Sequence, residues 1–326
     1  MPQAIVADEP GGPDVLKIQE VPAPNPGPHQ LLVKIAATGV NFIEIYQRSG
    51  VYPVPFPFTP GAEMAGTVEA IGAEVTDFAP GDRIATAGGT KTYADYALVD
   101  ADKAITVPES LDLETAAALP LQGMTAHYLC NSTYPATPGE TALVHAGAGG
   151  VGLLLTQMLK TKGVTVFTTV STEEKAQLSR EAGADDVFDY QDFAEKTRAA
   201  TDGRGVNVVY DGVGKTTFQG SLDSLSRRGM LVVYGGASGQ VEPFNIQELN
   251  SHGSLFLTRP TLVDYIATPE ELRWRATDVF TAAANGTLKV RIGEKYPLKD
   301  AGQAQADLAS RKTTGKLILL PGEPQG

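Results

Sequence analysis

A glycine-rich segment between a strand-like run and a helix-like run constrains this chain more than any other feature. The segment is His145-Ala146-Gly147-Ala148-Gly149-Gly150-Val151-Gly152, and the short, largely apolar run 140–144 before it is typical of a strand. Residues 151–160, which follow, have apolar side chains at helical spacing and no proline. The pattern predicts a strand, a tight turn and a helix, which is the start of a β-α-β unit.

Gly147, Gly149 and Gly152 fall in the G-x-G-x-x-G register. The first glycine permits the tight turn, the second lets the backbone approach a pyrophosphate, and the third lets helix and strand pack closely. The diphosphate would lie against the unpaired N–H groups and the positive end of the helix. A glycine turn without any ligand is the alternative, but the strand before it and the helix after it favour dinucleotide binding.

Two patterns divide the chain, whose 326 residues exceed the usual size of one domain. Short strands broken by glycine and proline fill residues 1–107 and predict a β-rich barrel or sandwich. Strands and helices then alternate, which predicts a doubly wound parallel sheet. A helix at 272–286 and strand-like segments at 287–290 and 316–320 suit the first half. We therefore expect a cofactor domain at 123–263, inserted in a β-rich domain of residues 1–122 and 264–326.

Composition excludes several classes of partner and site. A formal charge of −12 and a pI near 4.8 argue against a nucleic-acid surface, which needs clustered Lys and Arg. The single cysteine, Cys130, excludes an internal disulfide and a thiolate-rich zinc site, and it fits a reducing compartment. The N-terminus does not resemble a signal peptide, and no long uncharged apolar run occurs. We expect a soluble, cytoplasmic protein with no nucleic-acid or membrane partner.

A helical segment interrupts the β-rich half at 41–48 and is followed by the proline-broken loop 51–57. Asn41, Tyr46, Arg48 and Tyr52 meet here. A helix capped by Asn41, with aromatic rings filling the end of a barrel, is one interpretation. The other is that these side chains form one wall of a functional site.

The segment 254–259 predicts a further strand with an apolar edge. Such an edge could extend a sheet across a two-fold dimer.

Several spaced motifs resemble one known family. One motif comprises Gly139-Glu140, Leu143, Gly147-Ala148-Gly149-Gly150, Gly152, Gln157 and Lys160. The others are the segments 41–43, 48–53, 210–214 and 258–262. These segments are similar to those of the quinone oxidoreductase and zeta-crystallin branch of the medium-chain dehydrogenase/reductases, and the resemblance covers nearly the whole chain. It implies a Rossmann-type doubly wound parallel sheet domain inserted in a GroES-like β-rich catalytic domain, with NADPH, quinone acceptors and commonly a homodimer.

The resemblance also bears on metal binding. Zinc-dependent relatives use Cys and His ligands in the first domain, but the corresponding segments here, 38–41 and 61–63, contain neither. The four histidines, His29, His127, His145 and His252, lack ligand spacing. We expect no metal, so alcohol oxidation through a Lewis acid is disfavoured.

Cofactor choice depends on the end of the second strand of the fold, where NAD-selective proteins place an acidic residue. This strand ends in Val170-Ser171-Thr172, and Ser171, Thr172 and Lys175 offer donors for a 2′-phosphate. Glu173 and Glu174 weaken this case, and Lys175 could equally be a solvated helix lysine. The resemblance adds Tyr190 and Arg311, although Arg311 could be part of an ordinary exposed pair. The remaining predicted cofactor contacts are Asn41, Gln122, Thr125, Gly150, Val151, Gly214, Tyr234, Gly235, Phe256, Thr258 and Arg259.

Quinone reduction needs little help from acidic or basic side chains, because the two carbonyls of the quinone share the incoming negative charge and water can supply the proton. The site must hold the acceptor beside the nicotinamide and stabilise the developing oxyanion. We expect Asn41, Tyr46 and Tyr52 to line this slot, and Gln122, Thr125 and the 258–259 backbone to fix the nicotinamide amide. Reduction of an α,β-unsaturated ketone or aldehyde is an alternative. A weakly catalytic NADPH-binding protein with a structural or RNA-binding role is another, and the acidic charge disfavours RNA.

Overall fold

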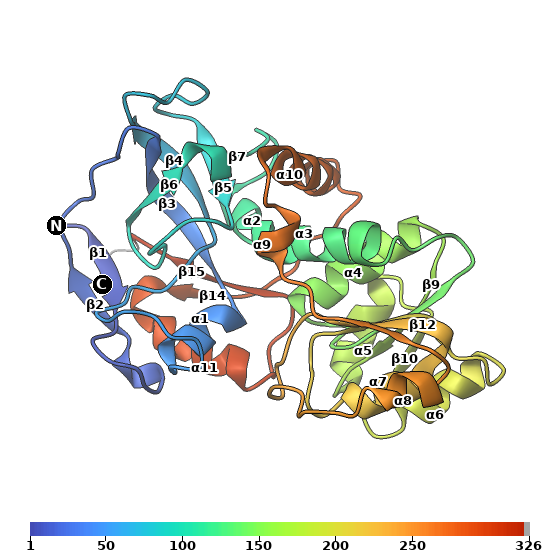
Figure 1. Ribbon diagram of the computed structural model, residues 1–326. Coiled ribbons are helices and arrows are strands. Elements are labelled where there is room, and N and C mark those ends of the chain that lie inside the picture. The colour runs from blue at the N-terminus through green and yellow to red at the C-terminus, as the bar shows by residue number, and fades with distance from the viewer. Residues whose placement is uncertain (323–326) are drawn as a thin grey trace. The chain divides into compact units, whose positions relative to one another are not determined.

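The computed structural model describes residues 1–322 and divides the chain into two compact units. Unit 1 is Met1–Leu121 together with the chain from Thr268 onward, and unit 2 is Gln122–Ala267. Each unit has its own sheet (Figure 1).

Unit 1 contains a seven-stranded sheet in the order β14-β15-β3-β4-β5-β7, with β6 also paired to β3. The strands are β3 (Gln30–Val40), β4 (Met64–Ile71), β5 (Arg83–Thr86), β6 (Tyr96–Asp100), β7 (Ile105–Thr106), β14 (Ile292–Pro297) and β15 (Lys316–Leu320), and a separate pair is β1 (Gln3–Val6) with β2 (Lys17–Glu20). The helices are α1 (Phe42–Arg48), α2 (Leu113–Ala117), α10 (Pro269–Ala284) and α11 (Ala301–Ala309), with short 3-10 turns at Pro13–Val15, Ala101–Lys103 and Leu298–Asp300.

Strand β3 is the centre of this sheet. Leu31, Val33, Ile35 and Ala37 are buried while Lys34 is exposed, which is the period-two pattern of a strand with one apolar face. Strands β4 and β15 both run antiparallel to β3, with Thr38 opposite Met64 and Val40 opposite Leu317. The end of β3 therefore lies beside the beginnings of β4 and β15.

Unit 2 contains a six-stranded sheet in the order β10-β9-β8-β11-β12-β13, and every pairing in it is parallel. The strands are β8 (Thr141–Val144), β9 (Thr165–Thr169), β10 (Asp186–Phe188), β11 (Val206–Asp211), β12 (Leu225–Val233) and β13 (Phe256–Thr258). The helices are α3 (Pro120–Tyr128), which begins in unit 1, α4 (Gly150–Thr161), α5 (Glu173–Glu181), α6 (Phe193–Ala200), α7 (Phe218–Ser224), α8 (Gln247–Ser251) and α9 (Leu262–Tyr265), with a π-helical turn at Leu129–Thr133.

Strands β9 and β10 extend the sheet on one side of β8, and β11, β12 and β13 extend it on the other, which is the order of a doubly wound sheet. Phe167, Leu143, Val209 and Leu231 belong to four adjacent strands, and they are buried in an apolar core with Leu222 of α7. Strand β13 ends the sheet and is paired on one side only.

One sequence-based expectation for unit 1 is wrong in detail, and one helix was not predicted. Residues 287–290 form no strand but the turn that ends α10, where the Leu288 amide donates to the Ala282 carbonyl and Gly286 has a φ of +77°. The strand begins later, at Ile292, and is followed by α11, for which the sequence analysis predicted no helix. No helix in residues 1–322 is long and apolar enough to cross a membrane.

Candidate functional site

The glycine segment lies where the sequence analysis predicts it, between β8 and α4. A Cβ atom on Gly152 would lie 2.2 Å from the Ala146 carbonyl oxygen, and one on Gly147 would lie 2.6 Å from the Thr168 Cβ. A Cβ on Gly149 would meet nothing closer than 3.2 Å. Gly147 and Gly152 are therefore required by packing within the protein, whereas Gly149 keeps the outer side of the loop open.

The beginning of α4 fits a phosphate group. Gly149 is the N-cap residue, and no side chain caps this helix end. The N–H groups of a first helical turn and the positive end of the helix dipole together attract anions. No side chain therefore competes with an anionic ligand for the N–H groups at this helix end.

The other predicted cofactor residues of unit 2 follow the carboxyl ends of parallel strands, which is where ligands bind in such sheets. Gln122 and Thr125 are exceptions, because they lie on α3, where they are 4% and 7% exposed. The residues at or after the strand ends are Ser171, Thr172 and Lys175 after β9, Tyr190 after β10, Gly214 after β11, Tyr234 and Gly235 after β12, and Phe256, Thr258 and Arg259 in or after β13.

The end of β9 has the hydroxyl groups expected from the sequence. Ser171 and Thr172 are exposed, and the Thr172 Oγ1 accepts a hydrogen bond from the Lys175 amide as the N-cap of α5. Glu173 forms an ion pair of 2.6 Å with Arg180, which offsets part of the negative charge near this strand end. Arg311 belongs to unit 1, directly after α11.

Tyr190 contacts the glycine segment itself. Its hydroxyl accepts a hydrogen bond of 3.1 Å from the Ala146 amide, and its ring stacks near His145. Ala146 has a φ of +54°, which costs a non-glycine residue energy and is maintained by its surroundings. Tyr190 thus stabilises the strained start of the loop.

A buried polar cluster lies directly behind the loop, and we call it the His145 cluster. His145 Nδ1 lies 2.7 Å from the Thr169 hydroxyl and Nε2 lies 2.9 Å from the Ser221 hydroxyl, which donates to Asp211. Asp211 also accepts hydrogen bonds from the Thr217 hydroxyl and from the backbone amides of residues 213 and 214. Burial lowers the pKa of His145 below 6.5, and the nearby Asp211 charge raises it in part. The cluster joins the ends of β8, β9 and β11.

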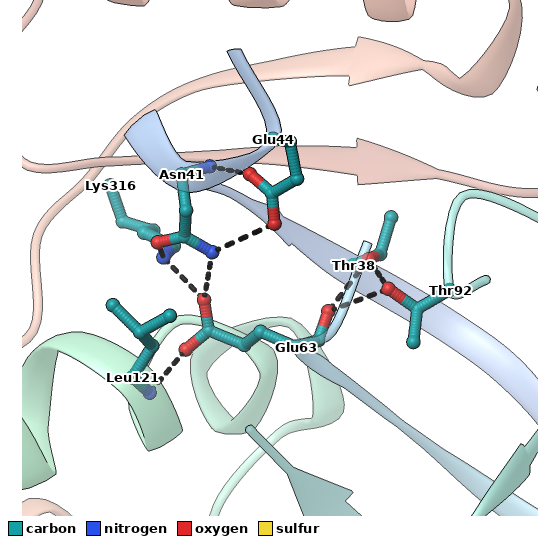
Figure 2. Close-up of polar contacts among 7 residues, drawn as sticks. All are labelled: Thr38, Asn41, Glu44, Glu63, Thr92, Leu121 and Lys316. Atoms are coloured by element: carbon teal, nitrogen blue, oxygen red, sulfur yellow. Dashed lines mark hydrogen bonds and ion pairs between the residues drawn. The ribbon is translucent and has the colours of Figure 1, made fainter. Parts of the chain in front are cut away.

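Unit 1 has a second buried polar cluster, shown in Figure 2, and we call it the Asn41 cluster. The Asn41 side-chain amide donates to Glu63 over 2.9 Å, and its oxygen accepts from the Lys316 ammonium over 2.6 Å. Lys316 also forms an ion pair with Glu63, and both side chains are almost completely buried. Asn41 begins α1 with a capping box, in which its backbone N–H donates to Glu44 over 2.6 Å.

The charges of the Asn41 cluster do not balance when every group is ionised. Two carboxyl groups, Glu44 and Glu63, face one ammonium, Lys316, within the buried cluster. Burial raises the pKa of Glu44 to about 8, against the opposing attraction of Lys316. At neutral pH Glu44 is therefore mostly protonated, and Glu63 is the carboxylate that pairs with Lys316.

Tyr46 and Tyr52, two of the three residues predicted to line the acceptor slot, lie together in unit 1. Their ring centroids are 5.4 Å apart in an edge-to-face arrangement, and the Phe42 ring centroid lies 6.2 Å from that of Tyr46. Tyr52 is 38% exposed. Both residues are joined to Asn41 through α1 and the turn after it.

The metal-binding pattern of zinc-dependent relatives does not occur in the part of the chain that the structure describes. No group of three or more His, Cys, Asp or Glu residues in this part is arranged to hold a metal ion. The segments 38–41 and 61–63 correspond to those that carry zinc ligands in zinc-dependent relatives. Here their residues Asn41 and Glu63 both contact the Lys316 ammonium instead.

Comparison with known proteins agrees with this architecture. Residues 27–109 match the alcohol dehydrogenase GroES-like domain, and residues 150–275 match the zinc-binding dehydrogenase family. A quinone oxidoreductase of Pseudomonas aeruginosa is 44% identical over 95% of this chain and 97% of its own. The chain belongs to the quinone oxidoreductase family.

Other relatives extend this result. A 2-haloacrylate reductase of Burkholderia sp is 41% identical over 98% of this chain and 99% of its own. The crystal structure of Escherichia coli quinone oxidoreductase complexed with NADPH superimposes with a TM-score of 0.96, at 42% identity, over 98% of this chain and 100% of that chain. Membership in the quinone oxidoreductase family confirms the predicted fold class, a Rossmann-type domain with a GroES-like domain, in the zinc-independent branch of the medium-chain dehydrogenase/reductases.

The sequence analysis missed the partners of Asn41. Glu44 had a local signal, because Asn-x-x-Glu at a helix start is the spacing of a capping box. Glu63 and Lys316 had none, because they are 253 positions apart and only the pairing of β4 and β15 with β3 brings them together. His145 and Asp211 were likewise not predicted as partners.

Proposed function

We propose that this chain reduces quinones with NADPH by hydride transfer. The observation that carries this conclusion is the glycine loop at the beginning of α4, in a chain that matches quinone oxidoreductases over nearly its whole length. The strand end Val170-Ser171-Thr172, which lacks a carboxylate, supports NADPH over NADH.

The residues have separate tasks in this proposal. NADPH, when bound, supplies the hydride. The backbone N–H groups of 150–152 bind the diphosphate, and Ser171, Thr172 and Lys175 donate hydrogen bonds to the 2′-phosphate. Tyr46 and Tyr52 hold the acceptor and donate to its reduced oxygen, which takes its proton from water.

A panel of acceptors with NADPH and NADH side by side tests the function. We expect turnover of 1,4-quinones with a marked preference for NADPH. Equal rates with NADH would contradict the assignment of the β9 end, and no quinone turnover with either cofactor would overturn the proposal. The variants Tyr46→Phe and Tyr52→Phe test the donors, because unchanged quinone reduction in both would exclude that role.

Reduction of activated alkenes is a second candidate function. Its support is the 41% identity to a 2-haloacrylate reductase, whose name refers to an α,β-unsaturated acid. Such a substrate needs the same hydride geometry but gains more from a proton donor at the α-carbon. Comparing kcat/KM for a 1,4-quinone, an alkenal and a 2-haloacrylate with NADPH separates the two functions.

We further propose a cytoplasmic homodimer built through β13. This strand is paired on one side only, and Phe256 on it is 57% exposed. Light scattering tests the proposal: the wild-type protein should have twice the mass of one chain, and Phe256→Lys should lower the mass toward that of one chain. Cell fractionation tests the location, which the single buried Cys130 favours.

A further inference from the structure

The orientation of the Asn41 carboxamide is determined by groups that allow only one arrangement. The Lys316 ammonium has donors only, so the amide atom 2.6 Å from it must be the oxygen. The amide nitrogen lies 2.9 Å from a Glu63 oxygen and 3.5 Å from a Glu44 oxygen. With both N–H groups directed at carboxyl oxygens and the oxygen facing Lys316, the plane of the Asn41 carboxamide is held in one orientation.

The Lys316–Glu63 ion pair, which sets the orientation of the Asn41 carboxamide, is itself held by further hydrogen bonds. Glu63 accepts a hydrogen bond of 2.7 Å from the Leu121 amide through its other oxygen. The Glu63 backbone carbonyl accepts from the Thr38 hydroxyl over 2.6 Å and from the Thr92 hydroxyl over 3.3 Å (Figure 2). Every oxygen of Glu63 is therefore used, which fixes its side chain from both ends.

The backbone of β3 leaves room for the Glu63 and Lys316 side chains at Gly39. A Cβ atom on Gly39 would lie 2.2 Å from a Glu63 side-chain oxygen and 2.8 Å from the Lys316 Cε. Gly39 lies opposite Ile318 of β15, and its amide donates to the Glu63 carbonyl. Only glycine admits both side chains between the end of β3 and the start of α1.

We infer that the buried Lys316–Glu63 ion pair is a positioning device, which fixes the Asn41 carboxamide so that Asn41 meets the bound cofactor or acceptor in one orientation. This rests on the proposed function of Asn41 as part of the site wall. The pair touches the ligand through Asn41 and not directly, so Lys316 and Glu63 are positioning residues. A local misplacement of this kind lowers the rate because hydrogen-bond geometry in the reacting complex is lost.

The test is a double-mutant cycle on the whole protein. Lys316→Met alone leaves Glu63 buried without a cation, so the main variant is Glu63→Gln/Lys316→Met, which removes both charges. A glutamine has one oxygen and cannot accept from both Leu121 and Asn41 as Glu63 does. We expect kcat/KM for a 1,4-quinone to fall about 10- to 100-fold. In an Asn41→Ala background the same two substitutions should change kcat/KM less than twofold.

The control variant is Glu114→Gln/Lys295→Met, which makes the same substitutions in an exposed ion pair of the same unit. Its kcat/KM should match the wild type, and Lys316→Arg should retain more activity than Lys316→Met. The inference would be overturned if Glu63→Gln/Lys316→Met lowered kcat/KM by the same factor in the Asn41→Ala background as in the wild type. It would also be overturned if the kcat/KM of Glu63→Gln/Lys316→Met were within twofold of the wild-type value. The proposed function fails separately, if the wild-type protein itself reduces no quinone.

Discussion

The two buried polar clusters solve the same problem in different ways. In the His145 cluster of unit 2, the single carboxylate, Asp211, is satisfied by two backbone amides and two hydroxyls, all within ten residues of it. In the Asn41 cluster of unit 1, Glu63 is satisfied by an ammonium from a strand 253 positions away. Backbone amides compensate a carboxylate without burying a second charge, whereas a buried ion pair makes each charge dependent on the other.

This difference in how the two carboxylates are compensated predicts which substitutions should destabilise each unit. Unit 2 presents backbone N–H groups at the glycine loop, so its weak points are Gly147 and Gly152, at which a side chain would overlap neighbouring atoms. Unit 1 presents side chains, so its weak points are the buried charges that hold them. The two clusters also respond to protons in opposite senses, because burial raises the pKa of Glu44 and lowers that of His145.

The largest expected effect is the loss of the only cation in the Asn41 cluster. Lys316→Met should lower the free energy of unfolding by about 3–5 kcal/mol, because Glu63 is left buried and unpaired. Glu63→Gln/Lys316→Met should recover most of this loss, and Lys295→Met, in an exposed pair, should change little. Chemical denaturation measures all three. A Lys316→Met protein as stable as wild type would show that the ion pair contributes nothing to folding.

Two glycines of the same loop should separate folding from binding in unit 2. Gly152→Ala should cost about 1–3 kcal/mol of stability and also weaken NADPH binding, since the new methyl group overlaps the Ala146 carbonyl. Gly149→Ala should cost less, about 0.5–1 kcal/mol, because alanine is a poorer N-cap than glycine and its methyl group would lie 3.2 Å from the Ala146 carbonyl oxygen, yet it should still weaken NADPH binding at least tenfold. Thermal unfolding and NADPH titration by calorimetry give the two numbers. Equal stability losses in both variants would contradict the proposal that Gly152 serves packing and Gly149 serves cofactor binding.

This contrast explains how much the sequence could reveal. Unit 2 was predictable because its strand, glycines and helix are consecutive, so local spacing determines the geometry of the loop. The proximity of Asn41, Tyr46 and Tyr52 was also predictable, because they lie on one helix and the turn after it. Glu63 and Lys316 were not, because their proximity follows from the antiparallel pairing of β3 with β4 and β15, which no local pattern encodes. The Leu288 turn was misread because one buried leucine after a helix resembles an alternating strand.

The titration of Glu44 should make unit 1 less stable as the pH rises. Between the ordinary pKa of 4.5 and the folded value of about 8, the folded state holds a proton that the unfolded state has lost. Stability should therefore fall over this range, at a slope of at most about 1.4 kcal/mol per pH unit, and level off above pH 8. Glu44→Gln should remove this slope, and Glu69→Gln, at an exposed position of β4, should keep it. Amide hydrogen exchange of β3 and β15 against pH follows unit 1 directly.

His145 should give unit 2 the opposite dependence, because burial lowers its pKa and the Asp211 charge offsets only part of that effect. Its folded pKa is lowered, so below pH 6.5 the unfolded state takes up a proton that the folded state does not. Stability should be fully present above pH 6.5 and should be lost as the pH falls below it. His145→Gln should flatten this acid-side loss in the amide exchange of β8 and β11, whereas His252→Gln, in the same unit and partly exposed, should not. If both units lost stability on the same side of neutrality, the two clusters would not be responding to protons independently.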